Sequence, residues 1–258
     1  PVAPSISNTA ALTTARLLAT RFDATVDGVS LRPAFTEVMA PDPIVAVTLP
    51  PANWDENKFD QDARAAFEAG GAGVNLRWRG GASVDDGSLG ALARLYDVTV
   101  LPRPGSGGSR MTAFESALFD SGRPVMMAPK TPPKSLGDTI VIHWNRSSET
   151  ARAVSLAMPI LRLAKSVLVL HVEGAEVPGP SARDAAGHLI ANGVPASDRV
   201  VAPGSMTPGE KILAECTAAN ADLLIKGAYT QSRLRQMIFG GPTSHILANA
   251  DIPVFFAH

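Results

Sequence analysis

Residues 221–243, which read ADLLIKGAYTQSRLRQMIFGGPT, decide the fold. The apolar run 221–225 is typical of a buried parallel strand, and residues 243–249 predict a helix with Thr243 near its N-cap. Glycines after the strand and before the helix let the backbone turn sharply and approach a ligand closely. Free N–H groups at a helix start attract phosphate. The local prediction is a cradle for an anion or a nucleotide, although glycines of an ordinary turn would give the same spacing.

The glycine spacing resembles the G-x2-G-x9-G-(S/T) signature of the universal stress protein family. Gly227 and Gly240 occupy two of its positions, and the intervening Ser-Arg-Leu-Arg and Ile-Phe-Gly-Gly are also typical of that family. The chain departs from the signature at Thr230, where the second glycine belongs, and at Gly241, where Ser or Thr follows. Thr243 could supply the missing hydroxyl. Thr230 argues against tight nucleotide binding.

The composition describes a folded chain with an ample apolar core. Its 258 residues, 45% hydrophobic and 18% charged, fit one large domain or two ordinary ones. The formal net charge of -1 is evenly spread, because residues 1–133 hold 12 basic and 14 acidic residues and residues 134–258 hold 11 and 10. A nucleic-acid surface concentrates Lys and Arg, so we expect no nucleic-acid partner.

The single cysteine excludes an internal disulfide and fits a reducing compartment. Neither a signal peptide nor an apolar run of membrane-spanning length is evident. We therefore expect a cytoplasmic protein without membrane contact. Cys216 lies in an apolar helical pattern, which favours a small core residue over a reactive thiol.

Helices and strands alternate in the pattern predicted from apolar periodicity. The expected helices are Ser7–Phe22, Asp55–Ala69, Ser88–Tyr96, Met111–Phe119, Ser147–Ala164, Ser181–Asn192, Thr207–Asn220 and Thr243–Asn249. The expected strands are Ala24–Leu31, Val74–Trp78, Asp97–Leu101, Pro124–Ala128, Thr139–His143, Ser166–Val172, Arg199–Val201, Ala221–Ile225 and Ile252–Phe256. This alternation implies parallel sheets with helices on both faces.

The same order of elements occurs on both sides of the proline- and lysine-rich segment 128–134, which reads as a linker. We therefore expect two domains, residues 1–133 and 134–258, related by internal duplication. The segments RPVMMA (123–128) and IPVFFA (252–257) are the clearest echo between them.

The resemblance to a tandem universal stress protein covers the whole chain, strongly over residues 139–258 and by order of elements before them. It implies an α/β fold of two doubly wound, five-stranded parallel-sheet domains, similar to the adenine-nucleotide α-hydrolases, whose last strands pair. We infer that Val125–Ala128 meets Pro253–Ala257 within the chain, as an intramolecular pseudo-dimer. The first domain is expected to be a degenerate copy, because its run Gly105–Ser109 lacks the glycine signature. We also expect its first strand to be clipped.

In open parallel sheets, ligands bind beyond the carboxyl ends of the strands, where the strand order reverses. The resemblance implies a nucleotide site there, formed by His143, Trp144, Asn145, Val172, Gly227, Tyr229, Thr230, Arg233, Gly240, Gly241, Pro242 and Thr243. Asn145 stands where the family usually has an acidic residue that contacts adenine or ribose, and an amide can still hydrogen-bond there. Arg233 could neutralise phosphate charge, or could be solvated on a surface helix. Trp144 could stack on a base, or pack under the neighbouring helix.

No catalytic or metal-binding residues are predicted. The chain has no serine nucleophile elbow, HExxH or P-loop motif, and His143 and His171 have no further ligands at metal-binding spacing. Because no general base or metal-binding carboxylate is evident beside the cradle, we expect at most slow ATP hydrolysis. A related α-hydrolase enzyme would carry a Ser-Gly-Gly-x-Asp-Ser loop, whereas residues 145–149 read NRSSE.

The resemblance therefore implies a stress-response module that binds or regulates, with at most one site for ATP or another adenine nucleotide, with Mg²⁺, in the C-terminal half. The alternative is a nucleotide-free protein-interaction module in which Thr230 and Asn145 have closed or neutralised the site. The expected partners are a nucleotide and an unidentified protein. Pairing into a homodimer stays open.

Overall fold

The computed structural model describes residues 1–4, 9–32, 36–39, 46–49, 52–71, 73–81, 83–105, 111–174, 176–228 and 241–258, with backbone only for 36–39 and 46–49. The helices are α1 (Thr9–Phe22), α2 (Glu56–Gly70), α3 (Leu89–Ala93), α4 (Met111–Asp120), α5 (Ser148–Leu161), α6 (Ala182–Ala191), α7 (Pro208–Ala218) and α9 (Pro242–Asn249). The strands are β1 (Thr25–Gly28), β2 (Thr36–Met39), β3 (Ala46–Leu49), β4 (Asn75–Trp78), β5 (Thr99–Pro102), β6 (Val125–Ala128), β7 (Thr139–His143), β8 (Ser166–Val172), β9 (Ala196–Val201), β10 (Leu223–Gly227) and β11 (Val254–Ala257). None of the described helices is long and apolar enough to span a membrane.

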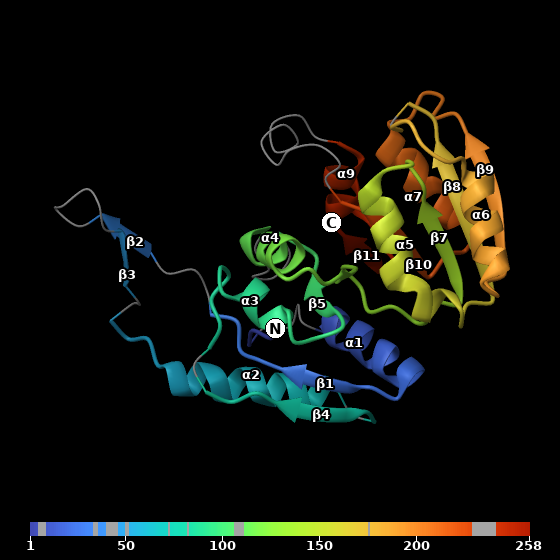
Figure 1. Cartoon of the computed structure of the whole chain (residues 1–258). Coiled ribbons are helices and arrows are strands. Elements are labelled where there is room, and N and C mark those ends of the chain that lie inside the picture. Colours follow the sequence, from blue (N-terminus) through green and yellow to red (C-terminus); the bar gives the residue numbers. More distant parts are fainter. Residues whose placement is uncertain are drawn as a thin grey trace.

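A seven-stranded sheet to which both halves contribute extends from β5, near the middle of the molecule, to β9 at the right-hand edge of Figure 1. Its order is β5-β6-β11-β10-β7-β8-β9. Neighbouring strands run parallel except β6 and β11, which are antiparallel, with Met127 opposite Val254. The α/β fold class and the pairing of the last strands of the two halves within one chain are thereby confirmed.

The two halves differ in how complete their sheets are. The C-terminal half has the five expected parallel strands, in the order β9-β8-β7-β10-β11. In the N-terminal half, β1 and β4 form a separate two-stranded parallel sheet, while β5 and β6 extend the large sheet. Ahead of α1, Val2 forms a single parallel bridge to Ser30. Within the described residues, the N-terminal half therefore has four strands of this arrangement, where five were expected. The antiparallel ribbon β2–β3 is a further addition to it.

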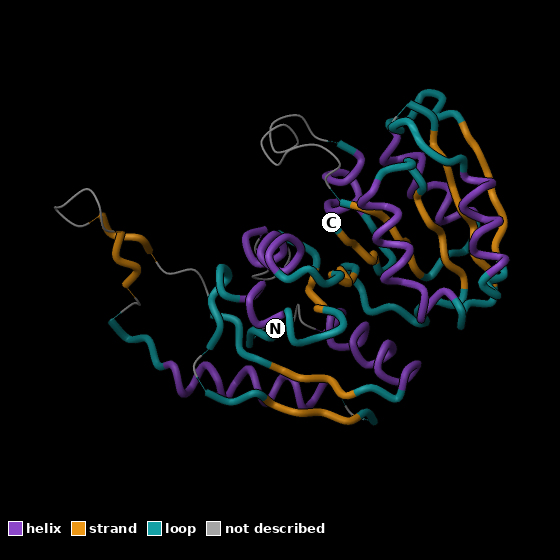
Figure 2. The backbone as a smooth tube through the Cα atoms, in the orientation of Figure 1, coloured by secondary structure: helices purple, strands orange, loops and turns teal. Residues whose placement is uncertain are grey.

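Helices cover both faces of the seven-stranded sheet (Figure 2). On one face, α1, α5 and α6 enclose a cluster that includes Leu161 and Leu189. On the other face, α4, α7 and α9 enclose a cluster that includes Phe114, Ile212 and Ile246. Burial on both faces is why the central strands read as continuous apolar runs.

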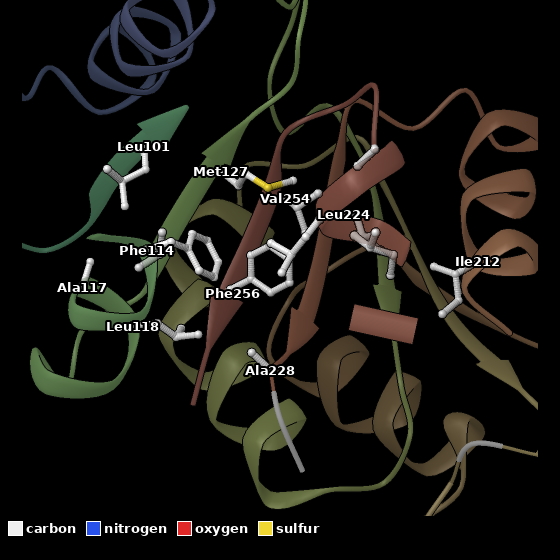
Figure 3. Close-up of a cluster of buried hydrophobic side chains, with 14 of the residues drawn as sticks. Leu101, Phe114, Ala117, Leu118, Met127, Ile212, Leu224, Ala228, Val254 and Phe256 are labelled. Carbon is white, nitrogen blue, oxygen red and sulfur yellow. The ribbon is translucent and has the colours of Figure 1, made fainter. Parts of the chain in front are cut away.

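The two halves share one of these clusters, which Figure 3 shows. Phe114 of α4 meets Phe256 of β11 edge to face, with ring centroids 5.5 Å apart. Both side chains are fully buried, and such a pair adds about 1 kcal/mol beyond the burial of its surface. The halves are therefore joined by common core packing as well as by strand pairing.

Side-chain caps define the starts of the helices around the C-terminal sheet. The hydroxyl of Ser147 accepts a hydrogen bond from the Thr150 backbone N–H at the start of α5. Thr207 and Glu210 form a capping box on α7, with Pro208 at its first position. Each such cap typically stabilises by about 1 kcal/mol. These caps place the helix starts beside the carboxyl ends of the strands.

Candidate functional site

The reversal of strand order in the C-terminal half lies between β7 and β10. From β7 the sheet continues to β8 on one side and to β10 on the other. The two strands are in parallel register, with His143 opposite Lys226 at their carboxyl ends. The turn into α5 and the segment leading to α9 leave from this point, as expected for a ligand site in a doubly wound sheet.

Gly227, the last residue of β10, lies directly against the first turn of α5. A Cβ atom at this position would lie 2.4 Å from the Thr150 backbone nitrogen and 2.6 Å from the Glu149 carbonyl carbon. No side chain fits there without moving backbone. The glycine is therefore required for this approach of strand to helix.

Thr150 connects this glycine to Asn145 on the opposite strand end. Its hydroxyl donates a 2.6 Å hydrogen bond to Asn145 Oδ1, which also accepts a 3.2 Å bond from the Ser147 N–H. Thr150 Oγ1 would lie only 2.8 Å from a Cβ atom on Gly227. Asn145, Thr150 and Gly227 are thus brought together, and the Asn145 side chain is held in one orientation.

The segment that follows β8 covers the turn after β7. The Val177 N–H donates to the Asn145 carbonyl at 3.1 Å, and the indole N–H of Trp144 donates to the Pro180 carbonyl at 2.9 Å. Arg146 has a φ of 68°, and Gly179 packs against its carbonyl oxygen. Trp144 is 7% exposed and packs in the cluster that α1, α5 and α6 enclose. Its ring therefore lies under the neighbouring helices.

Lys226 is a buried lysine between the two ends of the predicted loop. Its Nζ atom donates to the Gly227 carbonyl at 2.7 Å and to Thr243 Oγ1 at 2.9 Å, and the residue is 4% exposed. Burial lowers the pKa of this ammonium to about 7. The lysine ties β10 to the first turn of α9. It also donates a hydrogen bond to the Thr243 hydroxyl, which was expected to face phosphate.

His143 and His171 are both buried, at 3% and 2% exposure. Burial, with smaller effects from the charges of Lys226 and His171, lowers the pKa of His143 to about 3, so its ring is neutral at pH 7. Its Nε2 atom has no hydrogen-bond partner among the described residues. The register partner of His143 is Leu170, so the side chain of His171 points to the opposite face of the sheet. In the described ranges no group of three or more His, Cys, Asp or Glu residues could hold a metal ion.

The start of α9 forms the far side of the site. The N-cap residue is Gly241, which has no side chain to cap the first turn, and Pro242 is the first residue of the helix. Thr243, which follows, is buried. A helix start without a side-chain cap leaves amide donors and the positive end of the helix dipole for an anion. Val172 ends β8 with its side chain buried in the shared core.

Four predicted ligands, Tyr229, Thr230, Arg233 and Gly240, lie outside the described residues. The structure adds two residues for which the sequence analysis assigned no role. The signal for Lys226 was a lysine at the end of an apolar strand, and the signal for Thr150 was its position three residues after the cap Ser147. Cys216 is a buried core residue as predicted, and burial together with the charge of Glu215 raises the pKa of its thiol to about 12.

Residues 188–258 match the sequence model of the Universal stress protein family. This segment includes β10, α9 and the glycines of the candidate cradle, but neither β7 nor Asn145. None of the curated protein sequences matches the chain.

Solved structures share the fold over nearly the whole chain. A universal stress protein from Archaeoglobus fulgidus has 16% identity and a TM-score of 0.66, covering 95% of this chain and 91% of its own. A functionally unknown protein from Pseudomonas aeruginosa has 14% identity and a TM-score of 0.56, covering 95% and 86%. A shorter universal stress protein, solved in complex with cAMP, covers 47% of this chain and 96% of its own, with 21% identity and a TM-score of 0.39. The predicted resemblance is thus confirmed, by the family's sequence model for residues 188–258 and by the fold over the full chain.

Proposed function

We propose that this protein is a regulatory binding module of the universal stress protein type, with one adenine-nucleotide site in its C-terminal half. The observation that carries the proposal is the contact of Gly227 with Thr150, which joins both strand ends and the start of α5 at the reversal of strand order. Gly227, at the end of β10, belongs to the segment 188–258 that matches the family's sequence model.

The two sides of the site suit the two ends of a nucleotide. Asn145, held by Thr150 and Ser147, offers an amide to a base or a sugar hydroxyl. The start of α9 at Gly241 offers amide donors and a helix dipole to phosphate. Mg²⁺ would enter with the nucleotide, bound to phosphate oxygens.

The second candidate function is a nucleotide-free interaction module, and one observation favours it. Lys226 holds the Thr243 hydroxyl and the Gly227 carbonyl, which are groups at both ends of the predicted phosphate loop. A phosphate that needs this hydroxyl would have to replace a hydrogen bond in a buried position, which costs about 1–3 kcal/mol.

Calorimetric titration with ATP and Mg²⁺ distinguishes the two candidates. The parent chain is compared with Thr230→Gly, which restores the glycine of the family signature, and with Thr131→Gly, a matched control at an exposed linker residue. Micromolar binding by the parent and by the control supports the nucleotide site. Binding by Thr230→Gly alone supports the interaction module. If no variant binds, the nucleotide proposal is wrong.

A further inference from the structure

Three buried side chains form a row across the sheet beside the start of α9. His143 of β7, Lys226 of β10 and Phe256 of β11 stand opposite one another in parallel register, so they lie on the same face of the sheet. Each of them is at most 4% exposed. Thr243, in the first turn of α9, accepts a 2.9 Å hydrogen bond from Lys226 Nζ. Two nitrogen-bearing side chains are therefore buried together next to a helix N-terminus.

The hydrogen bonds of Lys226 match those of an uncharged amine. Its Nζ atom donates to the Gly227 carbonyl and to Thr243 Oγ1. An uncharged amine has two N–H groups, whereas an ammonium has three. The ring of Phe256, which Figure 3 shows facing Phe114 in the shared core, has its centroid 6.0 Å from Nζ, the outer limit of a cation–π contact. Within the described residues, the third N–H of an ammonium would therefore need a further acceptor.

His143 has unused hydrogen-bonding capacity in the same place. Its Nε2 atom is buried and has no partner among the residues that the structure describes. Burial lowers the pKa of this ring to about 3, so it stays neutral, and in one tautomer of a neutral ring Nε2 carries the hydrogen. Buried polar atoms are normally paired. An unpaired ring nitrogen beside a buried lysine therefore points to a ligand.

The first turn of α9 adds backbone donors to this cluster. Thr243 and Ser244 are the second and third residues of the helix, and N–H groups at these positions have no partner within a helix. Gly241, the N-cap, has no side chain to accept from them. Such amides bind phosphate oxygens. A phosphate held there would lie beside Thr243, where Lys226 could donate its third N–H without giving up its two existing bonds.

We propose that Lys226 and His143 form a phosphate-binding pair at the start of α9, in which Lys226 takes up a proton from solvent as the phosphate binds. This proposal deepens the proposed nucleotide site and rests on it. In the free protein, burial lowers the pKa of Lys226 to about 7, so the amine is largely uncharged at pH 8. A phosphate supplies an acceptor for the third N–H and a negative charge that favours the ammonium. Phosphate binding and protonation should therefore strengthen each other.

His143 is the titratable group that faces Lys226 from the neighbouring strands, since β11 presents Phe256. From the N-terminal half, α4 presents Phe114 to this ring. The titratable side chains on the helices of this face have other contacts: Lys211 pairs with Glu215, Glu210 caps α7 through Thr207, and His245 packs against Gly209. The proton taken up on binding is therefore assigned to Lys226.

Titration calorimetry of the full chain at pH 8, in Tris and in EPPS buffer, tests the proposal, because the two buffers differ in ionisation enthalpy and so report the number of protons bound. The probes are ATP with Mg²⁺, inorganic phosphate and adenosine. ATP should bind with an uptake of about 0.5–1 proton, and its affinity should fall about fivefold between pH 7 and pH 8. Inorganic phosphate should also bind with proton uptake. Adenosine, which has no phosphate, should bind without it.

Variants assign the effect to the two residues. Lys226→Met should abolish the proton uptake and weaken ATP binding at pH 7 about tenfold, because a charge-assisted hydrogen bond is lost. Lys134→Met, at an exposed lysine, is the matched control and should behave as the parent does. His143→Phe keeps an aromatic ring but removes Nε2. It should weaken binding about threefold to tenfold and leave the proton uptake unchanged.

The outcomes separate this pair from the nucleotide site itself. ATP binding without proton uptake would overturn the pair and leave the nucleotide site standing. Proton uptake that persists in Lys226→Met, or that accompanies adenosine, would also overturn the pair. Binding of inorganic phosphate with proton uptake, but not of ATP, would support the pair and refute the nucleotide site. If none of the three probes binds, both proposals are wrong.

Discussion

The Cα atom of Gly227 lies so close to α5 that a methyl group on it would come within 2.4 Å of the Thr150 backbone nitrogen. The contact joins the end of β10 to the helix that follows β7, and it brings the two sides of the candidate site together. Because the atoms that would be struck are backbone atoms, the helix cannot relax by rotating a side chain.

Gly227→Ala should therefore destabilise the fold by about 3 kcal/mol or more, at the upper end of the range for overpacking. The free energy of unfolding in denaturant checks this. Gly187→Ala is the matched control, since Gly187 is an exposed residue of α6 and a methyl group on its Cα would meet nothing within 4 Å. Its replacement should stabilise the protein by up to about 1 kcal/mol, because alanine favours the helix. Equal stabilities of the two variants would contradict the prediction.

Lys226→Met should stabilise the protein most at neutral and acidic pH. Burial lowers the pKa of Lys226 from 10.5 to about 7, so between these values the unfolded chain binds a proton that the folded chain does not. The stability of the parent therefore rises with pH across that window, and the advantage of methionine shrinks. After the loss of two hydrogen bonds, we expect a gain of about 2–4 kcal/mol near pH 6.

Denaturant unfolding at pH 6, 8 and 10 measures this pH dependence for Lys226→Met. Lys134→Met, at an exposed lysine, is the control and should show no such trend. An advantage of Lys226→Met that stays constant between pH 6 and pH 10 would show that the lysine remains protonated throughout that range.

Asn145→Asp should keep the fold and tighten nucleotide binding. Both side-chain hydrogen bonds to Asn145 Oδ1 come from donors, the Thr150 hydroxyl and the Ser147 N–H, so a carboxylate can accept them equally well. Charge-assisted hydrogen bonds to a sugar hydroxyl are stronger than neutral ones, so we expect affinity to rise about fivefold to tenfold. Calorimetry in the parent or Thr230→Gly background measures it. Asn145→Leu, which has no polar side chain at this position, should show no such rise in affinity. An unchanged affinity in Asn145→Asp would show that Asn145 is not part of the site.

Arg21→Ala should loosen the contact between α1 and the C-terminal half. Its guanidinium donates to the carbonyls of Leu136, Gly137 and Leu163 and to Asp138 Oδ1, at 2.6 to 3.0 Å. Losing these bonds, three of which are partly buried, should cost about 2–4 kcal/mol. Faster proteolysis at the 128–134 linker would accompany the loss. Arg16→Ala, on the same helix, serves as the control, and equal stability of both variants would refute the role of Arg21.

Apolar periodicity predicted whether a segment is a helix or a strand wherever both faces of the strand, or one face of the helix, are buried. Thr139–His143 and Ser166–Val172 were predicted to the residue, because their continuous apolar runs match burial on both faces. β9 begins at Ala196, three residues before the predicted Arg199, because it is an edge strand whose mostly exposed, polar residues are held in the sheet by backbone pairing with β8. Such pairing leaves no apolar pattern in the sequence.

The candidate site was predictable in its parts but not in its connections. Asn145 and Gly227 were both singled out, but the Thr150 hydroxyl, five residues after Asn145, reaches Gly227 only because α5 packs against the end of β10. The hydrogen bond from Lys226 to Thr243 spans 17 positions and crosses the predicted loop. Side chains from separate segments meet only after the sheet has formed, so their hydrogen bonds leave no local signal.

The sequence by itself determined the α/β class, the duplicated order of elements and the glycines that let strand and helix approach, because these depend on local periodicity and on backbone freedom. Only the tertiary structure decided that both halves share one hydrophobic core, that Lys226 is buried with a lowered pKa, and that β1 and β4 form a sheet separate from β5 and β6. Burial and partner choice depend on what distant segments bring to the same place. That information belongs to the packed chain.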